Sequence, residues 1–231
     1  MLKFNILFDN YTFDFDLESF WGFSCFIKTP TKNILFDTGS NGRILLKNAK
    51  KMKIDFKDID IVFISHNHWD HIGGLDTVLE ENPNVTLIVP NTLSKHLIKD
   101  LRRLSKDLIV IEDKMTKIAD NIYSTGMIDS SMPEQALMID INDELYVVTG
   151  CGHMGIPYLL KNLPIKKPVK YLLGGFHMLH MDTIKVKAAI EDINTEYITA
   201  THCSGEAAIG MLKIKYKEKF IAGGVGSTIR F

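Results

Sequence analysis

The chain has 231 residues, 45% of them hydrophobic and 24% charged, and its 27 basic and 28 acidic side chains give a formal net charge of −1. This composition lacks the basic excess that is typical of nucleic-acid-binding proteins and of segments that bind anionic membranes. No run approaches the roughly 18 apolar residues that a membrane span needs.

The cysteines and the first residues of the sequence indicate the cellular compartment of the protein. Cys25, Cys151 and Cys203 are too few and too far apart for a disulfide framework. The start, MLKFNILFDNYTFDFD, lacks the apolar core and the small-residue cleavage site of a signal peptide. These features predict a cytoplasmic protein with neither nucleic acid nor membrane as a partner. No linker divides the chain, so we expect a single domain over residues 1–231; the sequence is silent on oligomeric state.

Short apolar runs alternate with helical patterns along the chain. Strands are predicted over residues 3–8, 22–28, 33–36, 60–64, 86–89, 108–111, 136–141, 144–148, 169–173 and 196–200. Helices are predicted over residues 41–50, 71–81, 91–104, 153–162, 183–193 and 205–216, with Asn91 or Thr92 as a cap of the third. Turn-forming clusters at 29–33 and 142–144 predict hairpins. This order indicates a layered α/β fold whose sheets are covered by helices.

Four metal-binding side chains lie close together in "SHNHWDHIGG" (65–74), directly after the apolar run 61–64. They are His66, His68, Asp70 and His71. Imidazole and carboxylate together suit zinc, iron or manganese. Side chains alternate in an extended segment, so His66 and His68 point the same way and can hold one ion. We therefore predict a metal site here.

Three more histidines follow the carboxyl ends of apolar strands, each beside glycine. His153 follows 144–148, His177 follows 169–173, and His202 follows 196–200. Ligands at the ends of separate strands can converge on one rim of an α/β fold. The joint pattern favours a site role over an ordinary loop position most for His153 and His202, and less for His177. His96 and His180 stand alone and are expected to be ordinary surface or core residues.

The hexapeptide at 66–71 matches the H-x-H-x-D-H signature of the metallo-β-lactamase fold hydrolases, and the chain resembles that superfamily over about residues 20–205. "NILFDTG" (33–39), "VVTGCGHMG" (147–155) and "THCSG" (201–205) are similar to its other motifs. Together with "GGFHM" and "HCSGEAA", they resemble a subgroup labelled 7,8-dihydropterin-6-methyl-4-(β-D-ribofuranosyl)aminobenzene 5′-phosphate synthase-like.

The resemblance implies a four-layer αβ/βα sandwich of two mixed β-sheets flanked by helices. It also implies one or two divalent metal ions, with zinc the first choice and manganese or iron the alternatives. His66, His68 and His153 would hold the first ion, and Asp70, His71 and His202 the second. Asp37 would orient the ligand segment through hydrogen bonds, as the outer partners of metal ligands do.

One departure concerns the bridging aspartate that the superfamily usually supplies before the last motif. Here that region reads "LLGGFHMLHMD" (172–182), with no carboxylate directly after the glycines. His177 either replaces it as a metal ligand or contacts substrate. Asp182 is the nearest acid, and its place before the helix at 183–193 is typical of an N-cap.

The resemblance implies a metal-dependent hydrolase in which a metal-bound hydroxide attacks a small-molecule ester. Asp70 would be the catalytic residue that orients the hydroxide. A phosphoester, a lactone and a thioester all stay open. Backbone N–H groups of "CGHMG" and "HCSG" near helix starts favour a phosphate-bearing substrate, although the same glycines are explained equally well by tight turns.

The alternative is a synthase in pterin biosynthesis that uses the metal as a Lewis acid. Trp21, Trp69 and Phe176 could stack on a pterin, or wedge loops in place as aromatic residues often do. Cys151 and Cys203, beside His153 and His202, either join the metal as soft ligands or pack as small buried groups. A redox role or a binding-only role fits the full ligand set less well.

Overall fold

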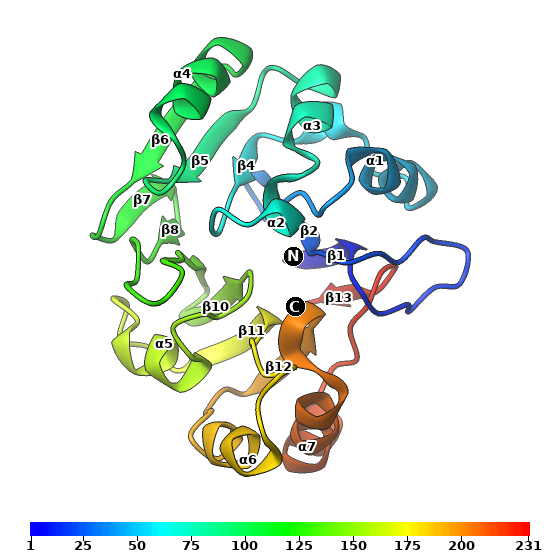
Figure 1. Ribbon diagram of the computed structural model, residues 1–231, viewed down its shortest axis with the longest axis vertical. Coiled ribbons are helices and arrows are strands. Elements are labelled where there is room, and N and C mark those ends of the chain that lie inside the picture. Colours follow the sequence, from blue (N-terminus) through cyan, green and yellow to red (C-terminus); the bar gives the residue numbers. More distant parts are fainter. The chain divides into compact units, whose positions relative to one another are not determined.

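The computed structural model describes residues 1–231 and divides the chain into two compact units (Figure 1). Unit 1 comprises Met1–Glu112 together with Gly224–Phe231, and unit 2 comprises Asp113–Gly223. Each unit is built on one mixed β-sheet with its own helices. The sequence predicts a single domain over residues 1–231. The two units do not test that expectation, which stays a prediction.

Unit 1 contains a seven-stranded sheet in the order β13-β1-β2-β3-β4-β5-β6. Its strands are β1 (Lys3–Phe8), β2 (Ser24–Lys28), β3 (Asn33–Phe36), β4 (Ile61–Phe63), β5 (Thr86–Pro90), β6 (Asp107–Ile111) and β13 (Thr228–Arg230). Pairing is antiparallel from β13 to β3 and parallel from β3 to β6. The parallel part brings the carboxyl ends of β3, β4 and β5 to one edge.

Helices pack against this sheet through apolar side chains. They are α1 (Gly42–Lys51), α2 (Trp69–Ile72), α3 (Leu75–Glu81) and α4 (Lys95–Leu104), with a 3-10 turn η1 (Phe56–Asp58). Leu45 of α1, Val78 of α3 and Leu101 of α4 are buried in one cluster with strand residues such as Val62 and Leu87. Burying each such side chain contributes roughly 1.5–3 kcal/mol, so this cluster holds the sheet edge in place.

Unit 2 contains a six-stranded sheet in the order β12-β11-β10-β9-β8-β7. Its strands are β7 (Thr116–Ala119), β8 (Ile122–Ser124), β9 (Leu137–Ile141), β10 (Glu144–Thr149), β11 (Val169–Gly175) and β12 (Tyr197–Thr201). Pairing is antiparallel from β7 to β10 and parallel from β10 to β12. The carboxyl ends of β10, β11 and β12 therefore share an edge.

The helices of unit 2 are α5 (Ile156–Asn162), α6 (Thr183–Glu191) and α7 (Glu206–Tyr216), with 3-10 turns η2 (His202–Ser204) and η3 (Lys217–Lys219). Helices α6 and α7 lie side by side (Figure 1). Leu159, Val186 and Leu212, one from each helix, are buried in one cluster with Val147 and Leu172 of the sheet. The Asp182 carboxylate accepts from the backbone N–H of Lys185, which confirms Asp182 as the N-cap of α6.

The helix predicted over 71–81 is interrupted at Gly73 and Gly74, and this prediction was wrong. A Cβ atom at Gly73 would lie 2.6 Å from the carbonyl oxygen of Ser40, and one at Gly74 would lie 2.4 Å from that of Thr38. The loop 38–40 therefore approaches too closely for any side chain there. Helix α2 ends early as a result, and its short turn carries the end of the histidine segment.

Other differences are smaller. Strands β7, β8 and β13 were not predicted, since each has only three or four residues and little alternation. The cap of α4 is Ser94, whose hydroxyl accepts from the N–H of Leu97, so the expected cap at Asn91 or Thr92 was wrong. The remaining predicted strands and helices are confirmed to within a few residues. No helix is long and apolar enough to cross a membrane.

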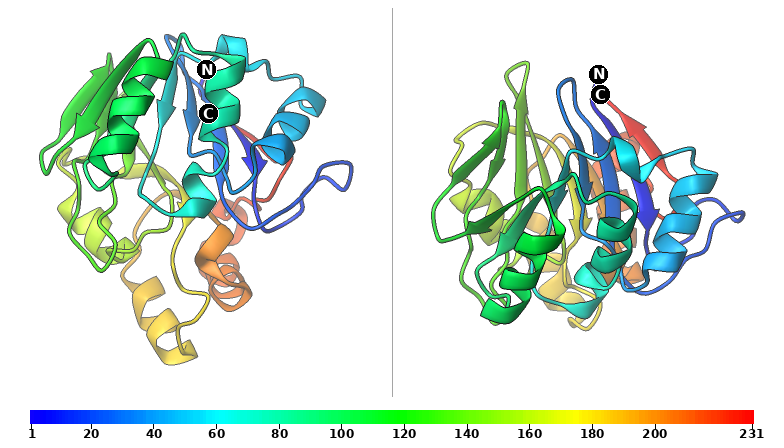
Figure 2. Two further views of the ribbon diagram at one scale, coloured as in Figure 1. Left: turned by 45° about the horizontal axis from the view of Figure 1, so that its top comes forward. Right: turned by 90° about the horizontal axis from the view of Figure 1, so that it is seen from above.

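Both termini lie in unit 1 and pair with each other (Figure 2). The backbone N–H of Leu2 donates to the carbonyl of Phe231 at 2.9 Å, and the N–H of Phe231 donates to the carbonyl of Leu2 at 2.9 Å. Two mixed sheets flanked by helices confirm the fold class that the sequence indicates.

Candidate functional site

The histidine segment of unit 1 begins where β4 ends. Ser65 and His66 are fully buried, and His68 stands at the N-cap position of α2 with φ −106° and ψ 145°. Asp70 and His71 lie in the single turn of α2 and are 6% and 0% exposed. His66 and His68 therefore follow the strand directly, with His68 in extended backbone. Asp70 and His71 lie in the helical turn that comes next.

Asp37, at the carboxyl end of β3, is the centre of the hydrogen bonds that hold this segment. It is fully buried. The Ser65 N–H donates to its Oδ1 at 2.7 Å, the Ser65 hydroxyl donates to its Oδ2 at 2.7 Å, and His71 Nδ1 lies 2.7 Å from Oδ2. The prediction that Asp37 hydrogen-bonds to the ligand segment is confirmed.

These bonds assign the proton positions on two histidine rings. A carboxylate only accepts, so Nδ1 of His71 carries its proton and Nε2 carries the lone pair. The Ser65 hydroxyl gives its one proton to Asp37, so His66 Nδ1, 2.9 Å from that hydroxyl oxygen, is its donor. His66 therefore also presents Nε2 as its lone-pair nitrogen, which is the form that ligates metals.

The distances between donor atoms suit metal binding. His66 Nε2 and His68 Nδ1 lie 3.0 Å apart, and His71 Nε2 lies 3.8 Å from Asp70 Oδ2. Two nitrogens on one tetrahedral ion, each about 2.0 Å from it, would be roughly 3.3 Å apart. The residues present in unit 1 thus fit a divalent metal, by donor chemistry and by spacing.

Burial raises the pKa of Asp37 above its ordinary value, because desolvation disfavours the charged carboxylate. The His71 imidazole and the hydrogen bonds from His71 and Ser65 act in the opposite direction. Burial outweighs these effects, so the charged form of Asp37 depends on the hydrogen bonds that His71 and Ser65 donate.

In unit 2, the three predicted histidines follow the neighbouring parallel strands β10, β11 and β12. The rings of His153 and His177 lie 4.3 Å apart between centroids. His202 is 1% exposed and begins the η2 turn. His177 and His202 both have left-handed backbone, with φ of 53° and 49°. Such strain costs on the order of 1–3 kcal/mol per residue and gathers at functional sites.

Glu134 organises the loop that carries His153. It is fully buried. Its Oε1 accepts from the Thr149 hydroxyl at 2.8 Å and from the backbone N–H groups of Gly150, Cys151 and Gly152 at 2.9, 3.0 and 3.1 Å. Its Oε2 accepts from the N–H of His153 at 3.0 Å. One carboxylate thus holds five consecutive residues of the loop.

Sequence reasoning missed Glu134 and Ser65. Glu134 stands in "SMPEQALM", fifteen positions from the nearest group that it binds, with no motif around it. Ser65 precedes the signature and carries no spacing signal. The fold brings Glu134 to the loop of His153, and it brings Ser65, which is next to His66 in the chain, to Asp37.

The cysteines of unit 2 lie beside these histidines. Cys151 and Cys203 are 4% and 6% exposed. A hydrogen bond with Cys203 raises the pKa of His177 above its ordinary value. Burial disfavours ionisation of Cys203, yet hydrogen bonds with Cys151 and His177 lower its pKa well below the ordinary value. The contact between the two groups thus shifts the pKa of each toward its charged form.

The aromatic candidates differ in exposure. Phe176 is 1% exposed and belongs to the core of unit 2, which confirms its packing role. Trp21 and Trp69 are exposed by 39% and 61% and remain available to a ligand.

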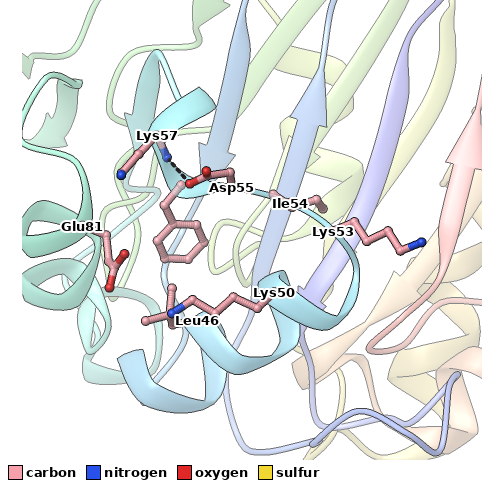
Figure 3. A pocket seen from close by; sticks show the side chains of 8 residues that line it. Leu46, Lys50, Lys53, Ile54, Asp55, Lys57 and Glu81 are labelled. Atoms are coloured by element: carbon pink, nitrogen blue, oxygen red, sulfur yellow. Dashed lines mark hydrogen bonds between the residues drawn. The ribbon is translucent and has the colours of Figure 1, made fainter.

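A hollow between the end of α1 and η1 is lined by Lys50, Lys53, Lys57 and Glu81 among others (Figure 3). None of the predicted site residues lines it.

Comparison with known proteins agrees with the fold. The model of the metallo-β-lactamase superfamily matches residues 22–129. A solved structure described as a metal-dependent hydrolase of the β-lactamase superfamily covers 100% of this chain and 99% of its own, with a TM-score of 0.83 and 23% identity. This likeness shows the fold.

Two relatives are similar in sequence. The 7,8-dihydropterin-6-methyl-4-(β-D-ribofuranosyl)-aminobenzene-5′-phosphate synthase of Methanocaldococcus jannaschii is 26% identical over 250 residues, covering 87% of this chain and 85% of that protein. Ribonuclease Z of Clostridium novyi is 29% identical over 148 residues, covering 60% of this chain and 43% of that protein. The chain is therefore similar to the metallo-β-lactamase superfamily in its signature motif, in residues 22–129 and in its fold.

Proposed function

We propose that this chain is a metal-dependent hydrolase of small-molecule esters, with phosphate-bearing esters as the first class to test. One observation carries the proposal. The lone-pair nitrogens of His66 and His71 are fixed by the Ser65–Asp37 hydrogen bonds, and His66 Nε2 and His68 Nδ1 lie 3.0 Å apart. These bonds leave a lone-pair nitrogen of each of the two imidazoles for a metal ion.

The proposal assigns the ligands of one or two divalent ions, with zinc first and manganese or iron as alternatives. From unit 1 they are His66, His68, Asp70 and His71, and from unit 2 they are His153, His177 and His202. When bound, such a metal lowers the pKa of a coordinated water and so supplies a nucleophile at neutral pH.

The chain's own residues then direct the reaction. Asp70 is nearly buried, and its Oδ2 lies 3.8 Å from Nε2 of His71. A carboxylate in this position orients an attacking water and accepts its proton at Oδ2. Asp37 keeps the His71 ring from rotating, and Glu134 fixes the backbone of His153. Both acids act by positioning, so neither needs to meet the substrate.

The test is a hydrolysis panel on protein reconstituted separately with zinc, manganese and iron. Substrates are phosphomonoesters, phosphodiesters, cyclic nucleotides, lactones and thioesters. A tRNA precursor is added because part of the chain is similar to ribonuclease Z. We expect one small-ester class to be cleaved and the RNA to stay intact. Cleavage of RNA alone would contradict a small-molecule substrate.

The matched variants are Asp70→Asn and His68→Ala, with His96→Ala as the control. His96 lies exposed on α4, outside the proposed ligand set. Both site variants should retain less than about a tenth of the wild-type rate while the control keeps it. If a folded site variant keeps more than about a tenth of the wild-type rate, the residue it replaces does not have the assigned role.

A second candidate is the synthase reaction, favoured by the similarity to the M. jannaschii protein over 87% of this chain. A metal held by the same ligands would then act as a Lewis acid for the group that leaves the 6-methyl carbon of a dihydropterin, while that carbon forms its bond to a ribofuranosylaminobenzene phosphate. Mass spectrometry of such a mixture, with each metal, separates the two candidates. A coupled product with no ester hydrolysis supports the synthase, and hydrolysis without a coupled product supports the hydrolase.

A further inference from the structure

Three donor atoms in unit 2 lie close together without being part of the H-x-H-x-D-H signature. The Sγ atoms of Cys151 and Cys203 and a ring nitrogen of His177 are all within 4.8 Å of one another. The two cysteines are almost completely buried, whereas His177 is partly exposed. Two buried thiols thus lie next to an exposed imidazole.

The backbone is shaped around the thiol of Cys203. Its Sγ accepts from the backbone N–H of His177 at 3.3 Å, and its S–H is 3.5 Å from the carbonyl oxygen of Cys151. A Cβ atom on Gly175 would lie 2.6 Å from that Sγ and 3.2 Å from Cα of Cys151. Only glycine at the end of β11 leaves room for both cysteines.

His177 has a backbone conformation that is intrinsically unfavourable for a residue with a side chain. Its φ of 53° is left-handed, which disfavours a residue with a Cβ atom by on the order of 1–3 kcal/mol. This turn places the N–H of His177 on the Cys203 sulfur and its ring next to the two thiols. An ordinary connecting loop has no need of this arrangement.

From this geometry we infer that Cys151, His177 and Cys203 form a ligand set for one thiolate-preferring divalent ion, such as zinc or cadmium. Two sulfurs and one nitrogen are ligands that suit zinc, and a set of three leaves the fourth position open to solvent or substrate. N–H···S bonds such as that from His177 are common at metal-bound thiolates, where they tune the sulfur. His177 is exposed, so an ion can approach the set from this residue.

This inference goes beyond the proposed function and changes one of its assignments, because His177 would bind this ion and not the ion of the hydrolytic site. It also makes His177 a metal ligand, whereas the sequence left open whether His177 binds metal or contacts substrate. The set binds metal through sulfur, and the histidine segment of unit 1 contains no sulfur. Cys151 Sγ also lies within 4.8 Å of donor atoms of His153 and His202, whereas Cys203 groups only with Cys151 and His177. A metal–sulfur signal that Cys203→Ser weakens therefore reports on this set.

The test is a cobalt titration of reduced, metal-free protein. Co²⁺ bound by thiolate gives an intense near-ultraviolet charge-transfer band, which nitrogen and oxygen ligands do not give. Wild type and Cys25→Ser should develop this band equally; Cys25 is the matched control, a buried thiol on β2 in unit 1. Cys151→Ser and Cys203→Ser should each lose about half of it, and His177→Ala should bind Co²⁺ at least tenfold more weakly.

A second measurement needs no variant. X-ray absorption at the zinc edge of wild-type protein, saturated with zinc and desalted, should show sulfur scatterers at about 2.3 Å. Nitrogen and oxygen neighbours alone, or a cobalt band that both cysteine variants retain in full, would overturn the inference. Loss of ester hydrolysis in Asp70→Asn with an unchanged cobalt band would concern the proposed function and leave this ligand set standing.

Discussion

The carboxylate of Asp37 lies 2.7 Å from Nδ1 of His71, although 34 positions separate the two residues in the chain. Both groups are fully buried, and the Ser65 hydroxyl also donates to Oδ2 of Asp37. This single contact fixes the orientation of one proposed ligand and, through Ser65, the proton position of another.

Replacing Asp37 by asparagine should weaken metal binding while the fold is kept. The amide oxygen can still accept, but the amide nitrogen would face donors at Ser65 and His71 and repel one of them. Loss of such an outer partner typically costs 10–100-fold in metal affinity. Competition with a zinc chelator measures it, and Asp100→Asn, an exposed acid on α4, serves as the control. An affinity within twofold of wild type would show that His71 does not rely on Asp37.

Glu134→Gln should destabilise unit 2 and loosen the loop that carries His153. Glutamine keeps one acceptor oxygen and turns an N–H group toward backbone N–H donors that the carboxylate satisfied. Leaving buried donors unsatisfied costs roughly 2–4 kcal/mol in the free energy of unfolding. Urea unfolding measures this loss, with the exposed Glu191→Gln as the comparison. If Glu134→Gln and Glu191→Gln unfold at the same urea concentration, Glu134 does not organise the loop that carries His153.

Two glycine-to-alanine substitutions should act in opposite directions. Gly74→Ala places a Cβ atom 2.4 Å from the Thr38 carbonyl oxygen and must displace the loop next to the histidine segment. We expect a loss of at least about 2 kcal/mol and weaker zinc binding. Gly210→Ala, inside α7, meets nothing within 4 Å and should stabilise by roughly 0.5–1 kcal/mol. Thermal unfolding of both variants provides the check, and a neutral Gly74→Ala would refute the close approach.

Removal of bound metal should lower the stability of the protein. A ligand that binds only the folded state stabilises it by about 2.7 kcal/mol at one hundred times its dissociation constant. Protein treated with a chelator should therefore melt several degrees below zinc-loaded protein, and added zinc should restore the transition. The His66→Ala variant should show a smaller difference between the two states. Identical melting curves for loaded and stripped wild type would count against a resident metal.

Much of the site could be predicted because it lies in short segments of the chain. His66, His68, Asp70 and His71 occupy one hexapeptide after a strong apolar strand, so spacing alone indicates a shared role. Asp37 was identified only through the resemblance of its motif, and the structure then supplied its partners. Glu134 and Ser65 could not be predicted, since their contacts arise from the packing of loops whose sequences carry no period.

The same distinction holds for the fold. Long apolar strands such as β10 and β11 follow from their composition, whereas β7, β8 and β13 are too short for alternation to be recognised. The break between α2 and α3 depends on the carbonyl groups of Thr38 and Ser40, more than thirty residues away in the chain. Local pattern gave a continuous helix there because it contains no information about that distant loop.

The pairing of β13 with β1 makes unit 1 discontinuous along the chain. A ribosome synthesises residues 1–112 first, then all of unit 2, and only afterwards the strand that covers the outer edge of β1. Throughout that interval the nascent first sheet carries an open edge, the feature through which strands from separate chains associate. Residues 224–231 thus protect this edge of the newly made protein against aggregation, and they do so only after unit 2 has been synthesised.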